Sequence, residues 1–359
     1  MKKSRIVVVA AIAALAVVAV SGCSNGAAPG ASGKTPDAGT ESNAPMPTVR
    51  YGIYEPGLDA GFLLMAQEKE FWKEHGVNVE VSTFKSASEA FPAFLSGQVD
   101  VIQANPSEAL LAADKGAELT FIGTTMAGMN YALYGNEKFD SVKDLTGATL
   151  GSATPTSLPT VVAKAMLMAS GVDPETVKLV KSGGSPDRYA AVVNGLVDAA
   201  SSPIDYVPRT EADGVKVLGL AKDIVPEYPR YALIAHNSFL EESPDAAVGL
   251  LAGLAEGIRY ALDNPDEAKA LTAATVGGLK ADDPAIEFAY NEFKDGGYLD
   301  SNVKVPVAGI KYLAELQVQV GISEKAVDVD PLVDESYQQK AMEKVGEVDP
   351  TYYGDINGG

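Results

Sequence analysis

The chain has 359 residues, which at roughly 150 residues per domain is enough for two or three domain-equivalents with large cores. Hydrophobic residues make up 46% and charged residues 21%, proportions that exclude general disorder and a multi-span membrane protein. Lys and Arg number 28 against 48 Asp and Glu, and the resulting formal charge of -20 has the wrong sign for binding nucleic acid.

The first 22 residues form a predicted signal peptide. Basic residues precede an apolar run from Ile6 to Val20, which is shorter than the roughly 20 residues that a membrane-spanning helix needs. Two small residues then lead to Cys23, the only cysteine, in an arrangement that resembles a bacterial lipobox. We therefore expect an extracytoplasmic lipoprotein, anchored to the bacterial cell membrane by lipid (palmitate) on Cys23. The alternative is an ordinary secreted protein, and no intramolecular disulfide can form in either case.

Residues 23–47 form a predicted flexible tether. They consist almost entirely of small and polar residues and cannot bury enough apolar surface to fold. From Thr48 onward, short apolar strands alternate with helical stretches that end in glycine, which favours an α/β fold with doubly wound, mostly parallel sheets. The first strands are predicted at 49–54, 77–84, 99–103 and 119–123, and a helix is predicted at about 61–75.

The helix, glycine and strand pattern returns about 98 residues later. Ser88–Val101 reads SEAFPAFLSGQVDV and Pro186–Ala199 reads PDRYAAVVNGLVDA, so the unit helix-G-x-V-D occurs twice. The tripeptide Tyr-Ala-Leu also recurs, at 131–133 and 231–233. We therefore expect two similar lobes.

The boundaries of these lobes follow from the helical patterns after residue 243, which have to pack back on the first lobe. Lobe 1 is predicted to be discontinuous, over 48–134 and 233–345, and lobe 2 to cover 135–232. Two strands near Tyr131–Asn136 and Pro229–His236 are expected to form the hinge between them. Residues 346–359 are expected to be a C-terminal tail.

Three motifs carry a family resemblance: SVKDLTGATLG at 141–151, the helix-G-x-V-D unit, and NPDEA at 264–268. With the lipobox, their order resembles the nitrate/sulfonate/taurine (NitT/TauT, SsuA/THI5-like) type of ABC-transporter substrate-binding protein over about 48–321. The resemblance implies a type II periplasmic-binding fold without a cofactor. It also implies a monomer that closes on a small molecule and delivers it to an ABC permease with its ATPase subunits.

Loops at the carboxyl ends of the strands are the expected place for a ligand. Four of them carry helix-start sequences, at 86–89, 105–108, 156–159 and 202–205, which resemble capping boxes with proline in the first turn. Converging helix N-termini suit an anionic group, so we expect a small organic anion or zwitterion such as a sulfonate, a taurine-like compound or an aromatic carboxylate. The alternative for each Ser or Asn, and for Glu89, Glu108 and Asp205, is that it only caps its own helix.

The predicted ligand-binding residues are polar or aromatic side chains in these loops and in the first loop after 54. They are Tyr54, Glu55, Asp59, Ser86, Ser88, Asn105, Ser107, Asn130, Thr154, Thr156, Ser157, Arg188, Ser202 and Asp205.

Arg188 lies in the first turn of a predicted helix, where a cation is unfavourable to the helix dipole, which suggests that it grips an anion. Its alternative role is a solvated surface arginine, and Arg230 beside the hinge is a weaker candidate. By contrast, Glu55 or Asp59 in the cleft would favour an amine, an aminopyrimidine or a zwitterion. Tyr54, Tyr131 and Tyr206 could supply an aromatic wall.

Enzymatic function is not expected, and neither is a metal site. The only histidines are His75 and His236, and neither lies in a nucleophile-elbow sequence. HExxH, Walker A and strand-following GxGxxG motifs do not occur, and Cys23 alone cannot supply a cysteine-rich iron motif. Two alternatives stay open: the same fold binding a thiamin-precursor-like pyrimidine, and an enzyme on the periplasmic-binding scaffold, because carboxylate pairs are not visible in a sequence.

Overall fold

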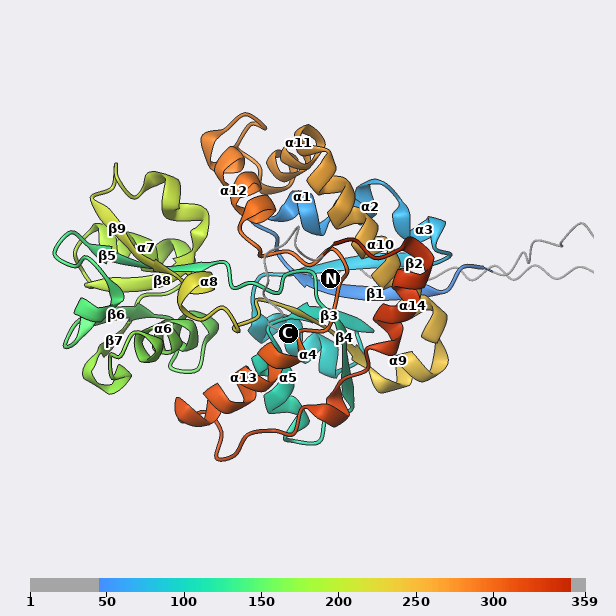
Figure 1. Cartoon of the computed structure of the whole chain (residues 1–359), viewed down its shortest axis with the longest axis horizontal. Coiled ribbons are helices and arrows are strands. Elements are labelled where there is room, and N and C mark those ends of the chain that lie inside the picture. The colour runs from blue at the N-terminus through green and yellow to red at the C-terminus, as the bar shows by residue number, and fades with distance from the viewer. Residues whose placement is uncertain (1–44, 350–359) are drawn as a thin grey trace, which may run out of the picture. The chain divides into compact units, whose positions relative to one another are not determined.

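The computed structural model describes residues 45–349, which contain two five-stranded sheets (Figure 1). The first sheet has the order β2-β1-β3-β10-β4, with β1 at Thr48–Tyr54, β2 at Asn78–Phe84, β3 at Val101–Ala104, β4 at Leu119–Gly123 and β10 at Ala232–His236. The second has the order β7-β6-β8-β5-β9, with β5 at Tyr131–Asn136, β6 at Thr149–Ser152, β7 at Lys178–Lys181, β8 at Ala199–Pro203 and β9 at Val215–Leu220. We call the parts built around the first and second sheets lobe 1 and lobe 2.

Helices cover both sheets. Those of lobe 2 are α6 (Leu158–Ala169), α7 (Ser185–Val193), α8 (Ala221–Ile224) and the 3-10 helices η1 (Val142–Leu145), η2 (Pro174–Thr176) and η3 (Ile204–Arg209). Those of lobe 1 from the first half of the chain are α1 (Ala60–Leu63), α2 (Met65–Glu68), α3 (Phe71–Glu74), α4 (Ala87–Leu95) and α5 (Pro106–Ala113). The rest are α9 (Asn237–Glu242), α10 (Pro244–Asp263), α11 (Pro265–Val276), α12 (Pro284–Asp295), α13 (Val307–Gln319), η4 (Asp330–Leu332) and α14 (Ser336–Val345). The C-terminal helices return to lobe 1, where α10 packs against α1, α2 and α3.

The predicted α/β fold is confirmed, with one strand of each sheet running against its neighbours. β1 is parallel to β2 and β3, and β6 is parallel to β7 and β8. β10 is antiparallel to β3 and β4, and β5 is antiparallel to β8 and β9. The two sheet orders therefore correspond strand by strand, with β10 of lobe 1 equivalent to β5 of lobe 2.

The predicted internal repeat corresponds to equivalent elements. α4 at 87–95 and α7 at 185–193 are 98 residues apart and lead into the equivalent strands β3 and β8. The aspartates of the two G-x-V-D units have the same role, because Asp100 accepts a hydrogen bond from the backbone N–H of Arg50 and Asp198 from that of Thr149, both at 2.8 Å. Asp100, which precedes β3, thus bonds to β1, and Asp198, which precedes β8, bonds to β6.

The first predicted hinge segment is misplaced, and the second is right only at its start, 229–231. Residues 131–136 are β5 and residues 232–236 are β10, and each strand is paired on both sides inside its own sheet. Both strands are almost continuously buried, as expected of strands that lie inside a sheet rather than on a crossing between lobes. The chain crosses between the sheets at 124–130, after β4, and again at 225–231, after α8.

The single helix predicted at 61–75 is also wrong. The segment forms three short helices, and the last break lies at Glu70, whose φ of 59° is left-handed and interrupts the helical path. The segment nevertheless packs tightly on α10, since a Cβ atom on Gly257 would lie 2.6 Å from the backbone N of Ala66. Glycine at this position permits the contact.

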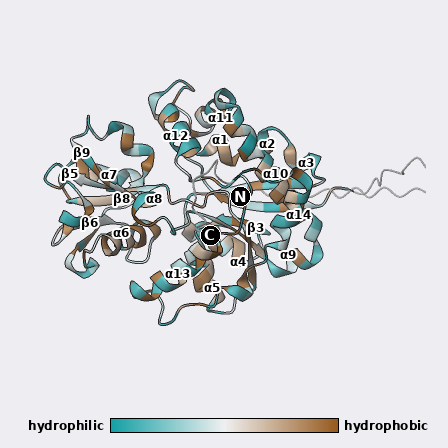
Figure 2. Cartoon of the chain, viewed as in Figure 1, coloured by the Kyte–Doolittle hydropathy of each residue, from teal (hydrophilic) through white to brown (hydrophobic). Residues whose placement is uncertain are grey.

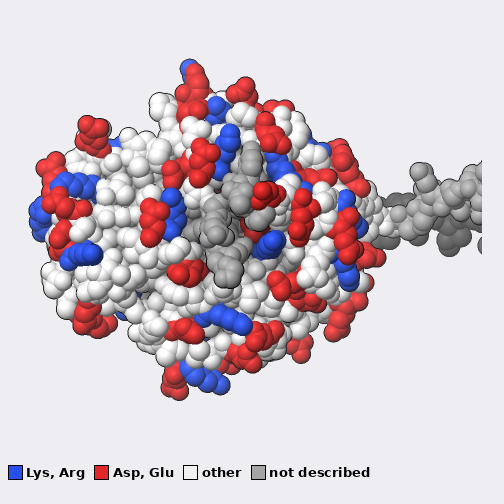
Figure 3. Space-filling model, in the orientation of Figure 1, with Lys and Arg blue, Asp and Glu red and all other residues white. Residues whose placement is uncertain are grey.

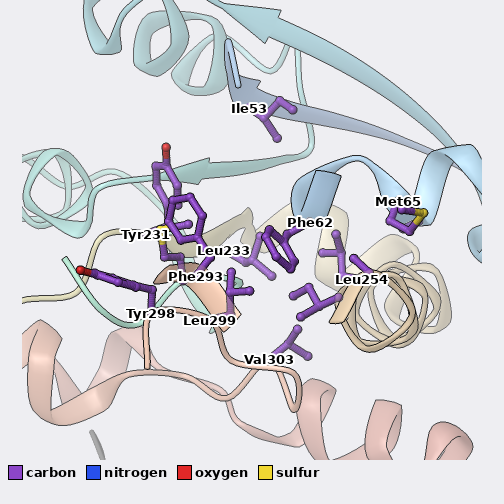
Figure 4. Packing of buried hydrophobic residues seen from close by; sticks show 14 of the residues in the cluster. Ile53, Phe62, Met65, Tyr231, Leu233, Leu254, Phe293, Tyr298, Leu299 and Val303 are labelled. Atoms are coloured by element: carbon purple, nitrogen blue, oxygen red, sulfur yellow. The ribbon is translucent and has the colours of Figure 1, made fainter. Parts of the chain in front are cut away.

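The core of lobe 1 joins residues from both halves of the chain. Phe62 of α1 stacks on Tyr290 of α12, with ring centroids 5.4 Å apart and an interplanar angle of 17°. Leu233 of β10, Leu254 of α10 and Phe293 lie in the same cluster (Figure 4). Figure 2 shows hydrophobic and hydrophilic residues side by side within the helices. The burial of this apolar surface holds the C-terminal helices on the first sheet.

Three predictions fall at the ends of the chain. The signal peptide, Cys23 and nearly all of the tether lie outside the described residues. Within residues 45–349, no helix is long and apolar enough to cross a membrane. The tail was expected to begin at residue 346, but residues 346 and 348 are packed. The carbonyl of Gly346 accepts a hydrogen bond from Arg259 at 2.9 Å. The side-chain amide of Asn302 donates to the carbonyl of Val348 and accepts from its backbone N–H. The packed part of the chain thus extends beyond residue 345.

Candidate functional site

Arg230 lies on the second crossing, between aromatic rings. Its guanidinium carbon is 4.2 Å from the ring centroid of Tyr231 and 5.4 Å from that of Tyr131. Burial opposes its charge, but the phenols of Tyr231 and Tyr131 and the carboxylate of Asp59 outweigh this and raise the pKa of Arg230. Its Nε and Nη1 atoms are buried without a hydrogen-bond partner in the described part of the chain. Arg230 therefore offers a permanent positive charge with free donors.

Two carboxylates from different lobes meet beside Gly57. A Cβ atom on Gly57 would lie 3.3 Å from Oδ2 of Asp205 and 3.8 Å from Oδ1 of Asp59. Burial raises the pKa of Asp59, and burial together with the charge of Asp59 raises the pKa of Asp205 to about 7, although Arg230 opposes both shifts. Asp205 is therefore near its titration range at neutral pH.

A third carboxylate, that of Glu108, lies in the first turn of α5. Burial raises the pKa of Glu108 to about 7, against the opposing effects of its own backbone N–H and Arg230. The preceding Asn105 caps α5, since its Oδ1 accepts from the backbone N–H of Ser107 at 3.1 Å. Nδ2 of Asn105 donates to the carbonyls of Pro229 and Arg230 at 3.3 and 3.2 Å. This helix start is thus fastened to the second crossing.

Further buried polar atoms without a hydrogen-bond partner among residues 45–349 come from both lobes and the first crossing. They are Oη of Tyr54, Oδ1 of Asn130 and Oγ of Ser201. The Tyr54 and Tyr231 rings lie 6.1 Å apart, and the Glu108 carboxylate is near enough to raise the pKa of Tyr54. Buried polar groups normally have partners, so such a set of groups suits a polar ligand.

We define the Arg230 cluster as Tyr54, Asp59, Glu108, Tyr131, Asp205, Arg230 and Tyr231. It contains one arginine and three carboxyl groups, so it can bind an acceptor group through Arg230 and donor groups through the carboxylates. A dianion would instead meet the negative charge of the carboxylates. The cluster therefore favours a small ligand that carries both kinds of group.

Arg188, predicted to grip the ligand, has three donor atoms bonded within the protein, and its ligand contact stays a prediction. It is 3% exposed, and its Nε, Nη1 and Nη2 atoms donate to the Ser201 carbonyl at 2.9 Å, the Gly183 carbonyl at 3.0 Å and the Ser185 hydroxyl at 3.0 Å. Burial lowers its pKa. The alternative of a solvated surface arginine is wrong, because Arg188 fastens the start of α7 to β8.

The predicted capping box at 86–89 does not form. Ser86 makes no side-chain cap to α4, and its Oγ lies 2.9 Å from that of Ser88. Glu89 accepts from the backbone N–H of Lys85 at 3.2 Å rather than from that of Ser86. The capping box predicted at 86–89 is therefore wrong, because these side chains bond locally in another way.

The other two predicted helix starts also differ from a capping box. Ser157 Oγ donates to the Thr154 carbonyl at 2.8 Å and accepts from the Thr154 backbone N–H at 3.1 Å. Ser202 belongs to β8, and its Oγ donates to the Ser185 carbonyl at 3.3 Å. Asp205 lies in η3, whose N-cap is Pro203 and which has no side-chain cap. Of the four starts, only that of α5 has the expected side-chain cap.

The remaining predicted residues divide by exposure. Glu55, Ser88, Thr154 and Thr156 are exposed and lie outside the Arg230 cluster. Tyr206 stacks on Tyr189 with centroids 4.5 Å apart, so it packs chiefly within lobe 2. The structure thus brings Tyr54, Asp59 and Asp205 together, with Asn105 in support.

Sequence reasoning missed Glu108 and Tyr231 as site residues and ranked Arg230 low. One signal pointed to this place, because the recurring Tyr-Ala-Leu marks the start of the antiparallel strand in both sheets. Arg230 immediately precedes one copy. The burial of its guanidinium depends on packing that the sequence pattern does not contain.

The histidines do not form a catalytic arrangement with a serine in the described part of the chain. Nε2 of His75 lies 2.7 Å from Glu256, and His236 stacks on Phe94 with centroids 4.1 Å apart. No group of three or more His, Cys, Asp or Glu side chains suitable for a metal ion occurs within residues 45–349.

Comparisons with known proteins support the resemblance noted in the sequence. The chain is 26% identical over 214 residues to a formylaminopyrimidine-binding protein of Halalkalibacterium halodurans, covering 58% of this chain and 64% of that protein. It is 26% identical over 354 residues to a putative aliphatic sulfonates-binding protein of Bacillus subtilis, covering 96% and 98%.

The fold is shared with the periplasmic aliphatic sulphonate binding protein SsuA from Escherichia coli. The TM-score is 0.67 at 19% identity, covering 81% of this chain and 92% of that one. This likeness confirms the predicted periplasmic-binding fold. The sequence profile described as NMT1/THI5 like matches residues 59–268, more than half of the chain. The chain therefore belongs to the NMT1/THI5-like family.

Proposed function

We propose that this chain is the extracytoplasmic solute-binding protein of an ABC importer, and that its lobes close on a small zwitterion at the Arg230 cluster. The observation that carries the ligand class is the buried guanidinium of Arg230, with two unpartnered donor atoms, in the same cluster as three carboxylates. A sulfonate or carboxylate group would bind Arg230, and an ammonium group would bind Asp59 or Asp205.

Closure fits the position of these groups. Asp59 belongs to lobe 1 and Asp205 to lobe 2, and Arg230 lies on a crossing between them. A ligand that bridges the two lobes gains contacts only when they are close together, so its binding favours the closed state. The related proteins of Bacillus subtilis and Halalkalibacterium halodurans are named as binding proteins, which supports a receptor rather than an enzyme.

A matched panel in a thermal-shift assay tests the ligand class, because a ligand that binds only the folded state raises the melting temperature. Taurine carries a sulfonate and an ammonium group, ethanesulfonate lacks the ammonium group, and ethylamine lacks the sulfonate. We expect a clear rise with taurine or a related zwitterion and a smaller one with either half. A larger rise with ethanesulfonate than with any zwitterion would refute the proposed ligand class.

The second candidate ligand is an aminopyrimidine. The carboxyl groups of Glu108 and Asp205, whose pKa values are raised, can pair with a ring nitrogen and the exocyclic amine of an aminopyrimidine. The rings of Tyr54, Tyr131 and Tyr231 offer surfaces on which the pyrimidine ring can stack. The name of the Halalkalibacterium relative points the same way. Formylaminopyrimidine in the same assay distinguishes this candidate from the zwitterion.

The partners and the location are part of the proposal. The permease with its ATPase subunits would receive the ligand, and a lipid on Cys23 would hold the monomeric protein at the cell membrane. Figure 3 shows acidic side chains interspersed with basic ones over the visible face, so net charge alone does not single out a docking surface. Metabolic labelling with palmitate tests the anchor, and label that persists in a Cys23→Ser variant would refute it.

A further inference from the structure

A small cavity is lined by Glu108, which also belongs to the Arg230 cluster. Its volume is about 30 Å³, and its polar lining includes Ser107, Glu108, Tyr228 and Gln317, from α5, the second crossing and α13, together with Asn105 and Thr156. Leu158 and Val161 of α6 close it from lobe 2. A cavity of this size holds a water molecule or a single ion.

Four buried oxygen atoms of this wall have no hydrogen-bond partner among the described residues: Oγ of Ser107, Oε2 of Glu108, Oη of Tyr228 and Oε1 of Gln317. Tyr228 and Gln317 are each at most 1% exposed. The Gln317 amide has a defined orientation, because its Nε2 donates to the Ser107 carbonyl at 2.8 Å and leaves Oε1 free.

Glu108 and Ser107 lie close enough to Tyr228 to change the pKa of its phenol. Burial and the charge of Glu108 raise the pKa of Tyr228, and a hydrogen-bonding contact with the adjacent Ser107 side chain lowers it. Tyr228 therefore stays protonated and neutral near neutral pH. Besides Asn105 and Thr156, the wall presents one carboxylate and three neutral oxygens, and no Lys or Arg lines it.

We infer that this cavity binds one monovalent cation, Na⁺ in the first instance. Oxygen-only surroundings suit hard cations, and a single carboxylate balances one positive charge. A divalent cation usually needs more acidic ligands, and Glu108 is the one acidic residue that lines the cavity. Arg230 offsets part of the charge of Glu108, so the affinity is expected in the millimolar range rather than tighter.

The cation would link three parts of the molecule. Lobe 1 contributes Ser107, Glu108 and Gln317, and the second crossing contributes Tyr228. Leu158 and Val161 of α6 come from lobe 2. Separation of the lobes would expose the cation to water. The site does not depend on the proposed zwitterion, so it can be tested on protein without an organic ligand.

The test compares melting temperatures in NaCl and in choline chloride at the same ionic strength. We expect Na⁺ to raise the melting temperature by at least about 2 °C in the unmodified protein. Tyr228→Phe removes one oxygen and Glu108→Gln removes the charge, and both should lose the Na⁺-dependent rise. Tyr312→Phe is the matched control, because the Tyr312 ring packs 6.1 Å from that of Tyr228 but does not line the cavity.

Crystals of the unmodified protein grown in RbCl provide a measurement that does not depend on folding of the variants. An anomalous peak in the cavity would support the inference. Equal melting temperatures in the two salts, a Na⁺-dependent rise that persists in both variants, or a water alone in the RbCl crystals would each overturn it.

Discussion

The guanidinium carbon of Arg230 lies 4.2 Å from the centroid of the Tyr231 ring. Tyr231 directly precedes β10 of lobe 1, and the second ring near Arg230, that of Tyr131, begins β5 of lobe 2. The two strands are equivalent in the two sheets, so Arg230 lies where the lobes and the second crossing converge. Its ring contacts restrict the guanidinium orientation and leave Nε and Nη1 for a ligand.

Arg230→Lys should weaken binding of the tightest ligand of the panel at least tenfold, or about 1.4 kcal/mol, in isothermal titration calorimetry. Lysine keeps the charge but lacks the planar, two-pronged donor geometry. Arg209→Lys is the matched control, because Arg209 is exposed and paired with Asp213 at 2.6 Å. Equal affinities of the two variants would remove Arg230 from the binding site.

Arg188→Gln should act mainly on stability. The variant leaves the carbonyls of Ser201 and Gly183 without their donors, so the free energy of unfolding should fall by about 2–4 kcal/mol in urea denaturation. Ligand affinity measured well below the melting temperature should change much less. Unchanged stability with a large loss of affinity would instead support the direct ligand contact expected from the sequence.

The sequence predicts the repeated scaffold well because its signals are local. Glycine after each helix and the continuous apolar runs at 131–134 and 232–235 depend on neighbours in the chain. The Arg230 cluster depends on side chains near 54–59, 105–108, 205 and 230 that meet only after both crossings are made. The pKa values of Asp205 and Glu108 are raised because the two carboxyl groups are buried. Residue spacing along the sequence does not predict this burial.

Stability should increase as the pH falls from 8 to about 5. Glu108 and Asp205 have folded-state pKa values of about 7, above the ordinary carboxyl values of 4.5 and 3.8, and that of Asp59 is also raised. Between the ordinary and the raised values the folded state binds more protons than the unfolded state, so the free energy of unfolding decreases as pH rises.

Urea denaturation at pH 5 and pH 8 measures this difference. The double variant Glu108→Gln, Asp205→Asn should be more stable than the unmodified protein at pH 8 and should show a flatter pH profile, whereas the exposed Glu89→Gln should not change the profile. A larger free energy of unfolding at pH 8 than at pH 5 in the unmodified protein, with the same pH dependence in the double variant, would contradict this prediction.

Asp198→Asn should destabilise lobe 2 through the strand beside its own. Oδ2 of Asp198 accepts from the backbone N–H and the hydroxyl of Thr149, at 2.8 and 2.9 Å, and Oδ1 accepts from Lys138 at 2.5 Å. Burial opposes its charge, but these donors outweigh it and lower the pKa of Asp198 to about 2. Its stabilising contribution is therefore present above about pH 3.8 and is lost as the pH falls through 2.

We expect Asp198→Asn to cost about 1–3 kcal/mol in urea denaturation at neutral pH. Asp100→Asn should also destabilise the protein, because Asp100 accepts from the backbone N–H of Arg50 in the equivalent position of lobe 1. Asp114→Asn is the control, since its exposed side chain lies at the end of α5. If both variants matched this control, the recurring G-x-V-D aspartate would have no structural role, and its repetition would need another explanation.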